Sequence, residues 1–233
     1  MTISHELIET LRQFDTPTVC NALEYLDPAR RRSGFNRVPL ICPFPDLRPV
    51  VGFARTAIIR CGAPNSAGPI EQRRLRLGYY EHVENGPRPS VAVIQDADEN
   101  ERGIGAFWGE VQTNLHAALG CLGVVTDGSV RDIPQMARDF FVLAGSIMPS
   151  HVHADIVDFN CPATVAGMSV QPNDLVHADR HGAVVIPADL AAALPAAAAL
   201  LARKEKIILD ACKRPSFPTA EIRAAFERMD EIH

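Results

Sequence analysis

The stretch that decides the fold comprises residues 109–132, with the sequence GEVQTNLHAALGCLGVVTDGSVRD. Apolar residues at helical spacing predict a helix over residues 109–120, and Gly120 is a typical helix stop. Residues 122–126 then predict a short buried strand. The apolar residues expected on one face of the helix are Val111, Leu115, Ala118 and Leu119.

The stretch ends in two adjacent opposite charges, Arg131 and Asp132, which follow a turn at Asp127-Gly128. Both residues are therefore expected just beyond the end of a strand, where open α/β sheets bind ligands. The free N–H groups at the start of the preceding helix can lie at the same end and hold an anion such as a carboxylate.

The composition is that of a globular protein. The chain has 233 residues, of which 47% are hydrophobic and 22% charged, and its net charge is −5. No basic stripe is visible, so we expect no nucleic-acid partner. Six scattered cysteines without a CxxC pair, no signal peptide and no apolar run of transmembrane length predict a cytoplasmic protein without membrane contact.

The first half of the chain predicts helices and buried strands in alternation. Residues 3–14 place apolar side chains on one helical face, and Thr16 is the expected N-cap of a second helix. Residues 50–60 and 90–95 read as strands. A loop with a short helix near 70–80 is expected between them.

The second half changes from β to α. Strand-like runs within residues 157–186 are separated by turn signals, which is an antiparallel pattern. Residues 188–213 are helical with a break or kink at Pro195, and a last helix begins near Thr219. We predict a single α/β domain, residues 1–233, with N-terminal helices 1–27, a core of mixed sheets over 50–187, and C-terminal helices 188–233.

Three charged residues are candidates for chemistry, and each has a structural alternative. Asp132 is suited to hold a divalent metal such as Mg²⁺, or simply caps a helix that begins at Ile133. Arg131 is suited to grip a substrate carboxylate with its planar fork, or forms a surface ion pair. Glu110 orients water near the metal, or only adds ~0.3–1 kcal/mol at a helix N-terminus.

The histidines show no established metal spacing. His151 and His153 would share one face if residues 151–153 formed a strand, which would suit a metal, but a loop after Pro149 is an equal alternative.

With these residues in hand, the chain resembles the family of class II pyruvate aldolases that also contains the regulator of RNase E activity A. The central match is an acid followed twenty residues later by Arg-Asp, here Glu110 and then Arg131-Asp132. The resemblance runs from about residue 15 to 210. The flanking matches are Asp15-Thr-Pro-Thr18 with Asn21-Ala-Leu23, Gly52-Phe-Ala-Arg-Thr56, Val170-Gln-Pro-Asn-Asp174, His177-Ala-Asp179 and Gly182-Ala-Val-Val-Ile-Pro187.

The resemblance implies a fold related to the swivelling β/β/α domain and a homotrimer or homohexamer with sites between subunits. It implies Mg²⁺ or Mn²⁺ held by Asp132, and a 2-oxo acid whose carboxylate and oxo group bind Arg131. The backbone amides of Gly109, Glu110, Val111 and Gln112 would complete the carboxylate pocket. Glu205 is the candidate for an acid that reaches the neighbouring subunit's site from the C-terminal helix. Family aldolases usually have Asp where this chain has Glu110.

The expected reaction is metal-assisted retro-aldol cleavage of a 4-hydroxy-2-oxo acid, of the 4-hydroxy-4-methyl-2-oxoglutarate type, to pyruvate. Glu110 and Glu205 would act in proton removal from the 4-hydroxyl group. Oxaloacetate decarboxylation passes through the same pyruvate enolate. Two alternatives stay open: a non-catalytic regulator that binds RNase E or a helicase, and a lyase that acts on another 2-oxo acid.

Overall fold

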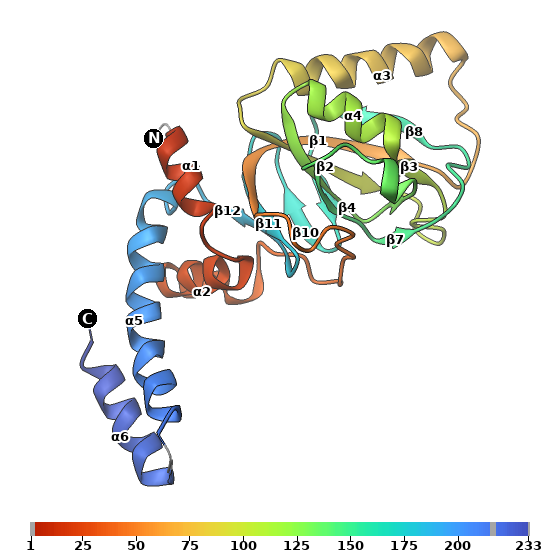
Figure 1. Ribbon diagram of the computed structural model, residues 1–233. Coiled ribbons are helices and arrows are strands. Elements are labelled where there is room, and N and C mark those ends of the chain that lie inside the picture. Colours follow the sequence, from red (N-terminus) through yellow and green to blue (C-terminus); the bar gives the residue numbers. More distant parts are fainter. Residues whose placement is uncertain (1–2, 215–217, 233) are drawn as a thin grey trace.

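The computed structural model describes residues 3–214 and 218–232, and Figure 1 shows its mixed α/β architecture. One seven-stranded sheet forms its centre. In spatial order its strands are β12 (Gly182–Ile186), β11 (Leu175–Asp179), β1 (Val50–Arg60), β2 (Ser90–Asp96), β4 (Cys121–Thr126) and β6 (Phe141–Leu143), with β8 (Asp155–Phe159) also paired to β1.

The middle of this sheet is parallel. β1, β2, β4 and β6 run in one direction, β8 and β11 pair antiparallel with β1, and β12 pairs antiparallel with β11. β1 and β2 are buried almost throughout, as expected for strands covered on both faces. The strands predicted at 50–60 and 90–95 are confirmed, and so are the antiparallel strands near the C-terminal end of the core.

Two smaller sheets complete the β structure. The strands of one are β3 (Ala106–Trp108), β5 (Ser129–Val130) and β7 (Ser146–Ile147), all parallel, and β9 (Ala163–Val165) pairs with β10 (Met168–Val170) in a hairpin. The sequence predicts no strand at β3, because a three-residue strand is too short to show a period of two.

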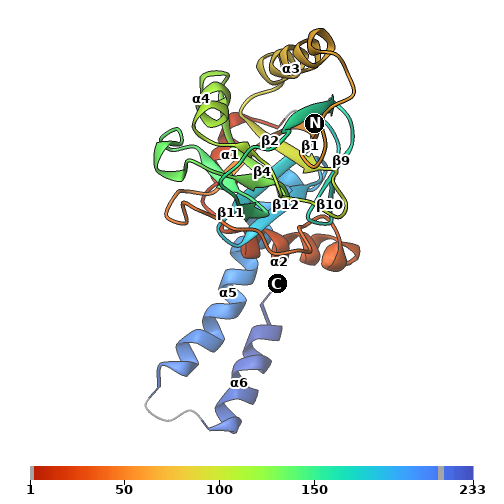
Figure 2. The same cartoon turned by 90° about the vertical axis from the view of Figure 1, so that its right-hand side faces the viewer.

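Helices cover opposite parts of the central sheet. In Figure 1, α3 (Pro69–Glu84) and α4 (Glu110–Ala118) lie over the β2–β4 region. α1 (His5–Leu11), α2 (Thr16–Leu26) and the first half of α5 (Leu194–Cys212) enclose a separate apolar cluster against β11 and β12. Figure 2 shows α5 and α6 (Thr219–Asp230) extending together away from the sheets. Short 3-10 helices occur at Pro28–Arg32, Ile133–Gln135 and Ala191–Ala193.

Two helix predictions need correction. The N-cap of α2 is Asp15, whose carboxylate accepts the Thr18 N–H at 2.9 Å, so Thr16 is already helical. Pro195 lies in the first turn of α5 and does not break it, because proline fits where no intrahelical N–H donor is required.

All strands of the described residues lie between Val50 and Ile186. The predicted domain of residues 1–233 also includes positions 1–2, 215–217 and 233, which lie outside the described part. Among the described helices, none combines the length and apolar character needed to traverse a lipid bilayer.

Candidate active site

The candidate site lies where two neighbouring strands of the small parallel sheet end. Gly109 follows β3, and Arg131 and Asp132 follow β5. Trp108 pairs with Val130, and the Arg131 N–H donates to the Trp108 carbonyl at 2.9 Å. This pairing brings two parts of the chain, twenty-two residues apart, to one edge of the sheet.

A cavity of about 240 Å³ opens at this edge. Its volume suits a small metabolite, since drug-sized ligands fill sites of ≈ 300–1,000 Å³. Six predicted site residues line it: Gly109, Glu110, Val111, Gln112, Arg131 and Asp132. The first backbone hydrogen bond of α4 runs from Thr113 to Gly109, so the N–H groups of residues 110–112 have no intrahelical acceptor and are available to a ligand.

Asp132 has an unusual backbone. Its φ of 56° and ψ of 35° place it in the left-handed region, which aspartate tolerates better than most residues. Its side chain makes no capping hydrogen bond to the following 3-10 helix within the described chain, so the capping alternative is not supported. The carboxylate lies 3.3 Å from Arg131 Nε, and both side chains are partly exposed. Such an ion pair is worth little and can exchange its partners for a ligand.

Gly109 provides the space that Asp132 occupies. A Cβ atom at this position would lie 2.7 Å from Asp132 Oδ2 and 3.2 Å from Arg131 Cγ. Because residue 109 has no side chain, the Asp132 carboxylate can occupy its observed position.

The helix α4 presents a different face to the core from the one expected. Val111 is 67% exposed and Leu115 is 39% exposed, whereas Thr113 and His116 are fully buried. The Thr113 hydroxyl donates to the Gly109 carbonyl at 2.9 Å and accepts the Ala137 N–H at 3.0 Å. These two bonds join the start of α4 to the segment that follows Asp132.

His116 stabilises α4 from the buried side of the helix. Its Nδ1–H donates to the Gln112 carbonyl at 2.7 Å, which leaves Nε2 to accept the Tyr79 hydroxyl at 2.8 Å. The ring also lies 4.4 Å from the Trp108 ring, centroid to centroid. Burial lowers the pKa of His116 to about 4, so the imidazole is neutral in the folded protein near pH 7.

The buried His116 predicts loss of stability in acid. Its pKa is about 4 when folded and 6.5 when unfolded, so only the unfolded chain gains this proton between those values. The free energy of unfolding should therefore fall as the pH drops from 6.5 to 4, by about 3 kcal/mol from this residue. Urea unfolding of wild type and His116→Gln across this range measures it.

The free energy of unfolding should depend less on pH in His116→Gln than in wild type. The other histidines titrate in both proteins, so their contributions cancel in the comparison. Equal slopes would contradict the prediction. If the variant does not fold, the His116 pKa can be measured by NMR in wild type, where a value above 6 would contradict it.

Two residues that we did not single out for this site's substrate also line the cavity, Arg76 from α3 and His151. His151 lies in a loop, which confirms the loop alternative after Pro149 and not a strand face shared with His153. His153 is not among the lining residues of this cavity. The adjoining Val152 has a φ of 48°, a strained value for a β-branched residue. Strain of this kind often accompanies functional sites.

A second group of possible metal ligands comprises Cys61, Asp96 and Asp98. Backbone N–H groups of Cys61 and Gly62 donate to Asp98, and that of Gly103 donates to Asp96 at 2.8 Å. Burial, together with the charge of Asp96, raises the pKa of the Cys61 thiol to about 12. A protonated thiol beside two carboxylates that accept backbone bonds fits a loop anchor better than a metal centre.

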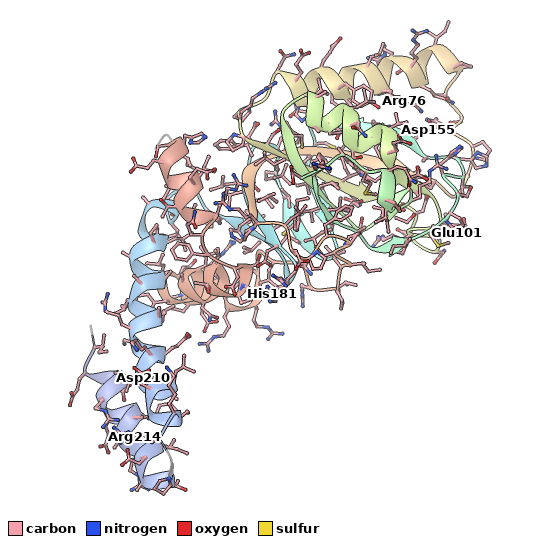
Figure 3. All side chains as sticks on the ribbon, viewed as in Figure 1. Arg76, Glu101, Asp155, His181, Asp210 and Arg214 are labelled. Carbon is pink, nitrogen blue, oxygen red and sulfur yellow. The ribbon has the colours of Figure 1, made fainter. Side chains whose placement is uncertain are left out.

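Glu205 lies elsewhere in the same chain. It lines a different pocket, between α2 and α5, with Asn21, Glu24 and Leu201 among its neighbours. In Figure 3, Asp210 of α5 lies at the opposite end of the molecule from Arg76. Glu205 therefore does not join the other predicted residues within one chain.

Comparison with known proteins gives a family match over most of the chain. A family model described as "RraA-like: Aldolase/RraA" matches residues 16–185. A Halalkalibacterium halodurans protein named "Putative 4-hydroxy-4-methyl-2-oxoglutarate aldolase" is 27% identical over 190 residues, covering 79% of this chain and 80% of the relative. "Protein DlpA" of Legionella pneumophila is 28% identical over 111 residues, or 46% of this chain, and this chain covers only 18% of DlpA.

A solved structure shows the same fold. Streptomyces coelicolor RraAS2, described as an unusual member of the RNase ES inhibitor RraA protein family, has a TM-score of 0.68 and 21% identity to this chain. The match covers 88% of this chain and 96% of RraAS2. At this identity the likeness concerns the fold alone.

Proposed function

Because the chain belongs to the RraA-like family, Aldolase/RraA, we propose that it is a divalent-metal-dependent lyase. Its proposed reaction is cleavage of a 4-hydroxy-2-oxo acid to pyruvate, with oxaloacetate decarboxylation through the same pyruvate enolate. The observation that carries this proposal is the convergence of Arg131, Asp132 and the free amides of α4 on one small cavity.

The residues of the cavity fit Mg²⁺ or Mn²⁺. Both ions prefer oxygen ligands and often bind through one or two carboxylates plus water. Asp132 supplies a partly exposed carboxylate in the space left by Gly109, and Glu110 supplies a second one nearby. The ion, when bound, supplies Lewis-acid stabilisation of negative charge on the oxo group.

The remaining chemistry is assigned to the chain itself. Arg131 binds the carboxylate and oxo group through its planar fork and stabilises charge that develops on the enolate. The amides of residues 110–112 orient the same carboxylate. Glu110, together with Glu205, positions the water that takes the proton of the 4-hydroxyl group. Its side chain is one methylene longer than the aspartate usual in the family, so the position of this water and the substrate preference can differ from those of the family aldolases.

We further propose that Glu205 acts at the site of a neighbouring subunit in a homotrimer or homohexamer in the cytoplasm. Its separation from Asp132 within one chain supports a role between subunits. The projecting α5 and α6 also leave large apolar side chains exposed, with Leu209 at 59% and Phe226 at 47%. Exposed apolar surface of this kind is typical of an interface.

The test is release of pyruvate from oxaloacetate, followed with lactate dehydrogenase. We expect turnover with Mg²⁺ or Mn²⁺ that stops on addition of a chelator. The control is metal without protein, because free ions decarboxylate oxaloacetate themselves. Turnover no faster than this control, together with no cleavage of 4-hydroxy-2-oxo acids by folded protein, would reject the lyase. A binding role toward RNase E or a helicase would then be the better account.

A further inference from the structure

The cavity carries two arginines from separate elements, and a single carboxylate requires only one of them. Arg131 follows β5, whereas Arg76 lies in the middle of α3. We propose that Arg76 binds a second carboxylate at the far end of the substrate, so that the site selects 2-oxo dicarboxylates over 2-oxo monocarboxylates. This inference rests on the proposed lyase function and adds a specificity-determining residue to it.

Arg76 is held in place by a partner from another part of the fold. Its Nη2 donates to Asp155 Oδ1 at 3.0 Å, and Figure 3 shows the two side chains side by side below α3. Asp155 begins β8 and pairs with Arg60 of the central sheet, so its position is fixed by the sheet. By contrast, Arg74 pairs with Glu71 on its own helix. Asp155 therefore orients Arg76 from a separate element, β8.

The ion pair leaves Arg76 able to bind a ligand. A guanidinium has five N–H donors, and the contact with Asp155 uses one of them. The Arg76 side chain is 46% exposed, whereas that of Asp155 is only 16% exposed. The charged group thus remains accessible at the cavity, and a second carboxylate can accept two parallel hydrogen bonds from it.

The charges of the cavity make Arg76 necessary for a dianionic substrate. Glu110 and Asp132 also line the cavity, so a distal carboxylate without its own cation would face other carboxylates. Arg76 is suited to be that cation, because an arginine is charged throughout the physiological pH range. Sites built to bond a polar group also discriminate against analogues that lack it.

The cavity volume agrees with this substrate class. About 240 Å³ accommodates a five-carbon acid with carboxylates at both ends, as in 4-hydroxy-2-oxoglutarate. Cleavage between C3 and C4 converts the bond pair into the pyruvate enolate, and the 4-hydroxyl oxygen becomes the carbonyl of glyoxylate after losing its proton. The carboxylate held by Arg76 leaves with the glyoxylate fragment.

The test compares binding of two acids that the enzyme cannot cleave, 2-oxoglutarate and 2-oxopentanoate, by titration calorimetry in the presence of Mg²⁺. They differ only in the distal carboxylate. Wild type should bind 2-oxoglutarate about 10–100-fold more tightly, as expected for a charge-assisted pair. Arg76→Met should remove this preference and leave the affinity for 2-oxopentanoate within about 3-fold.

Arg73→Met is the matched control, since it removes the same charge from an exposed position of α3 that does not line the cavity. It should leave both affinities unchanged. Equal weakening of both acids by Arg76→Met, or an unchanged preference, would overturn the role of Arg76. So would the same loss of preference in Arg73→Met.

A second measurement separates this proposal from the proposed function. Exchange of the pyruvate methyl protons with D₂O, followed by NMR, reports enolate formation and needs no second carboxylate. Exchange in both wild type and Arg76→Met, with an unaltered preference for 2-oxoglutarate, would reject only the role of Arg76. Absence of exchange in wild type would count against the lyase itself, whereas failure of both acids to bind while exchange occurs would overturn only the role of Arg76.

Discussion

Replacing Asp132 with asparagine is expected to lower kcat/KM for oxaloacetate decarboxylation by about 1,000-fold. Loss of a residue that only supports a metal ligand costs 10–100-fold, and loss of the ligand itself should cost more. The backbone should not change, because asparagine tolerates the left-handed conformation of residue 132 as well as aspartate does. Steady-state kinetics measure the loss of kcat/KM. Calorimetric titration of Mn²⁺ measures the expected loss of metal affinity.

Asp139→Asn is the matched control for this substitution. Asp139 is also exposed, has a φ of 62°, and does not line the cavity. It should retain wild-type activity and Mn²⁺ affinity. Equal activity of the two variants would show that the carboxylate of Asp132 is not required.

Replacing Gly109 with alanine is expected to lower kcat/KM by about 100-fold with little change in stability. The new Cβ would lie 2.7 Å from Asp132 Oδ2, so the carboxylate must move. Asp132 is partly exposed and its side-chain end can shift, so the fold should tolerate the substitution. A displacement of roughly 1 Å at a reacting group can cost about 100-fold in rate. Activity and thermal unfolding of the same sample distinguish these effects.

Gly68→Ala is a close control for Gly109→Ala. Both glycines precede a helix without a side-chain cap, but a Cβ at Gly68 meets nothing within 4 Å. The control should keep full activity. Unchanged activity in Gly109→Ala would mean that Asp132 does not need its observed position.

The central strands could be predicted because strands that are buried on both faces are nearly continuous runs of apolar residues. β1 begins at Val50 and ends at Arg60, as expected, and β2 extends the expected strand by only Asp96. Glycine signals also located α4 well, since Gly120 follows its end with a φ of 82°. Arg131 and Asp132 were expected beyond the strand at residues 122–126, but they follow β5, a two-residue strand of the small sheet that the sequence did not indicate.

The orientation of α4 could not be predicted in the same way. Apolar spacing favoured burial of Val111 and Leu115, but Thr113 and His116 occupy the interior instead. Their polar atoms are satisfied by Gly109, Ala137, Gln112 and Tyr79. Three of these partners are backbone groups, and Tyr79 lies on another helix. The pattern of side chains along α4 therefore does not predict these hydrogen bonds.

Arg76 was missed for a related reason. The sequence predicted only a short helix near residues 70–80, and α3 in fact covers Pro69–Glu84. When a helix carries several arginines, its sequence does not indicate which of them lines a cavity. The contact with Asp155 joins residues 79 positions apart and exists only once β8 has paired with β1.

The small sheet of β3, β5 and β7 joins the cavity to the apolar core, because Trp108 and Val130 belong to the same buried cluster as the central strands. Its strands have two or three residues each, whereas the large sheet has its own hydrogen-bonding register. Gly109 alone separates β3 from α4, so an insertion at this point would displace both the helix and the Asp132 carboxylate beside it. Engineering of new acceptor substrates is therefore better directed at exposed side chains that line the cavity, such as Val111, than at insertions beside β3.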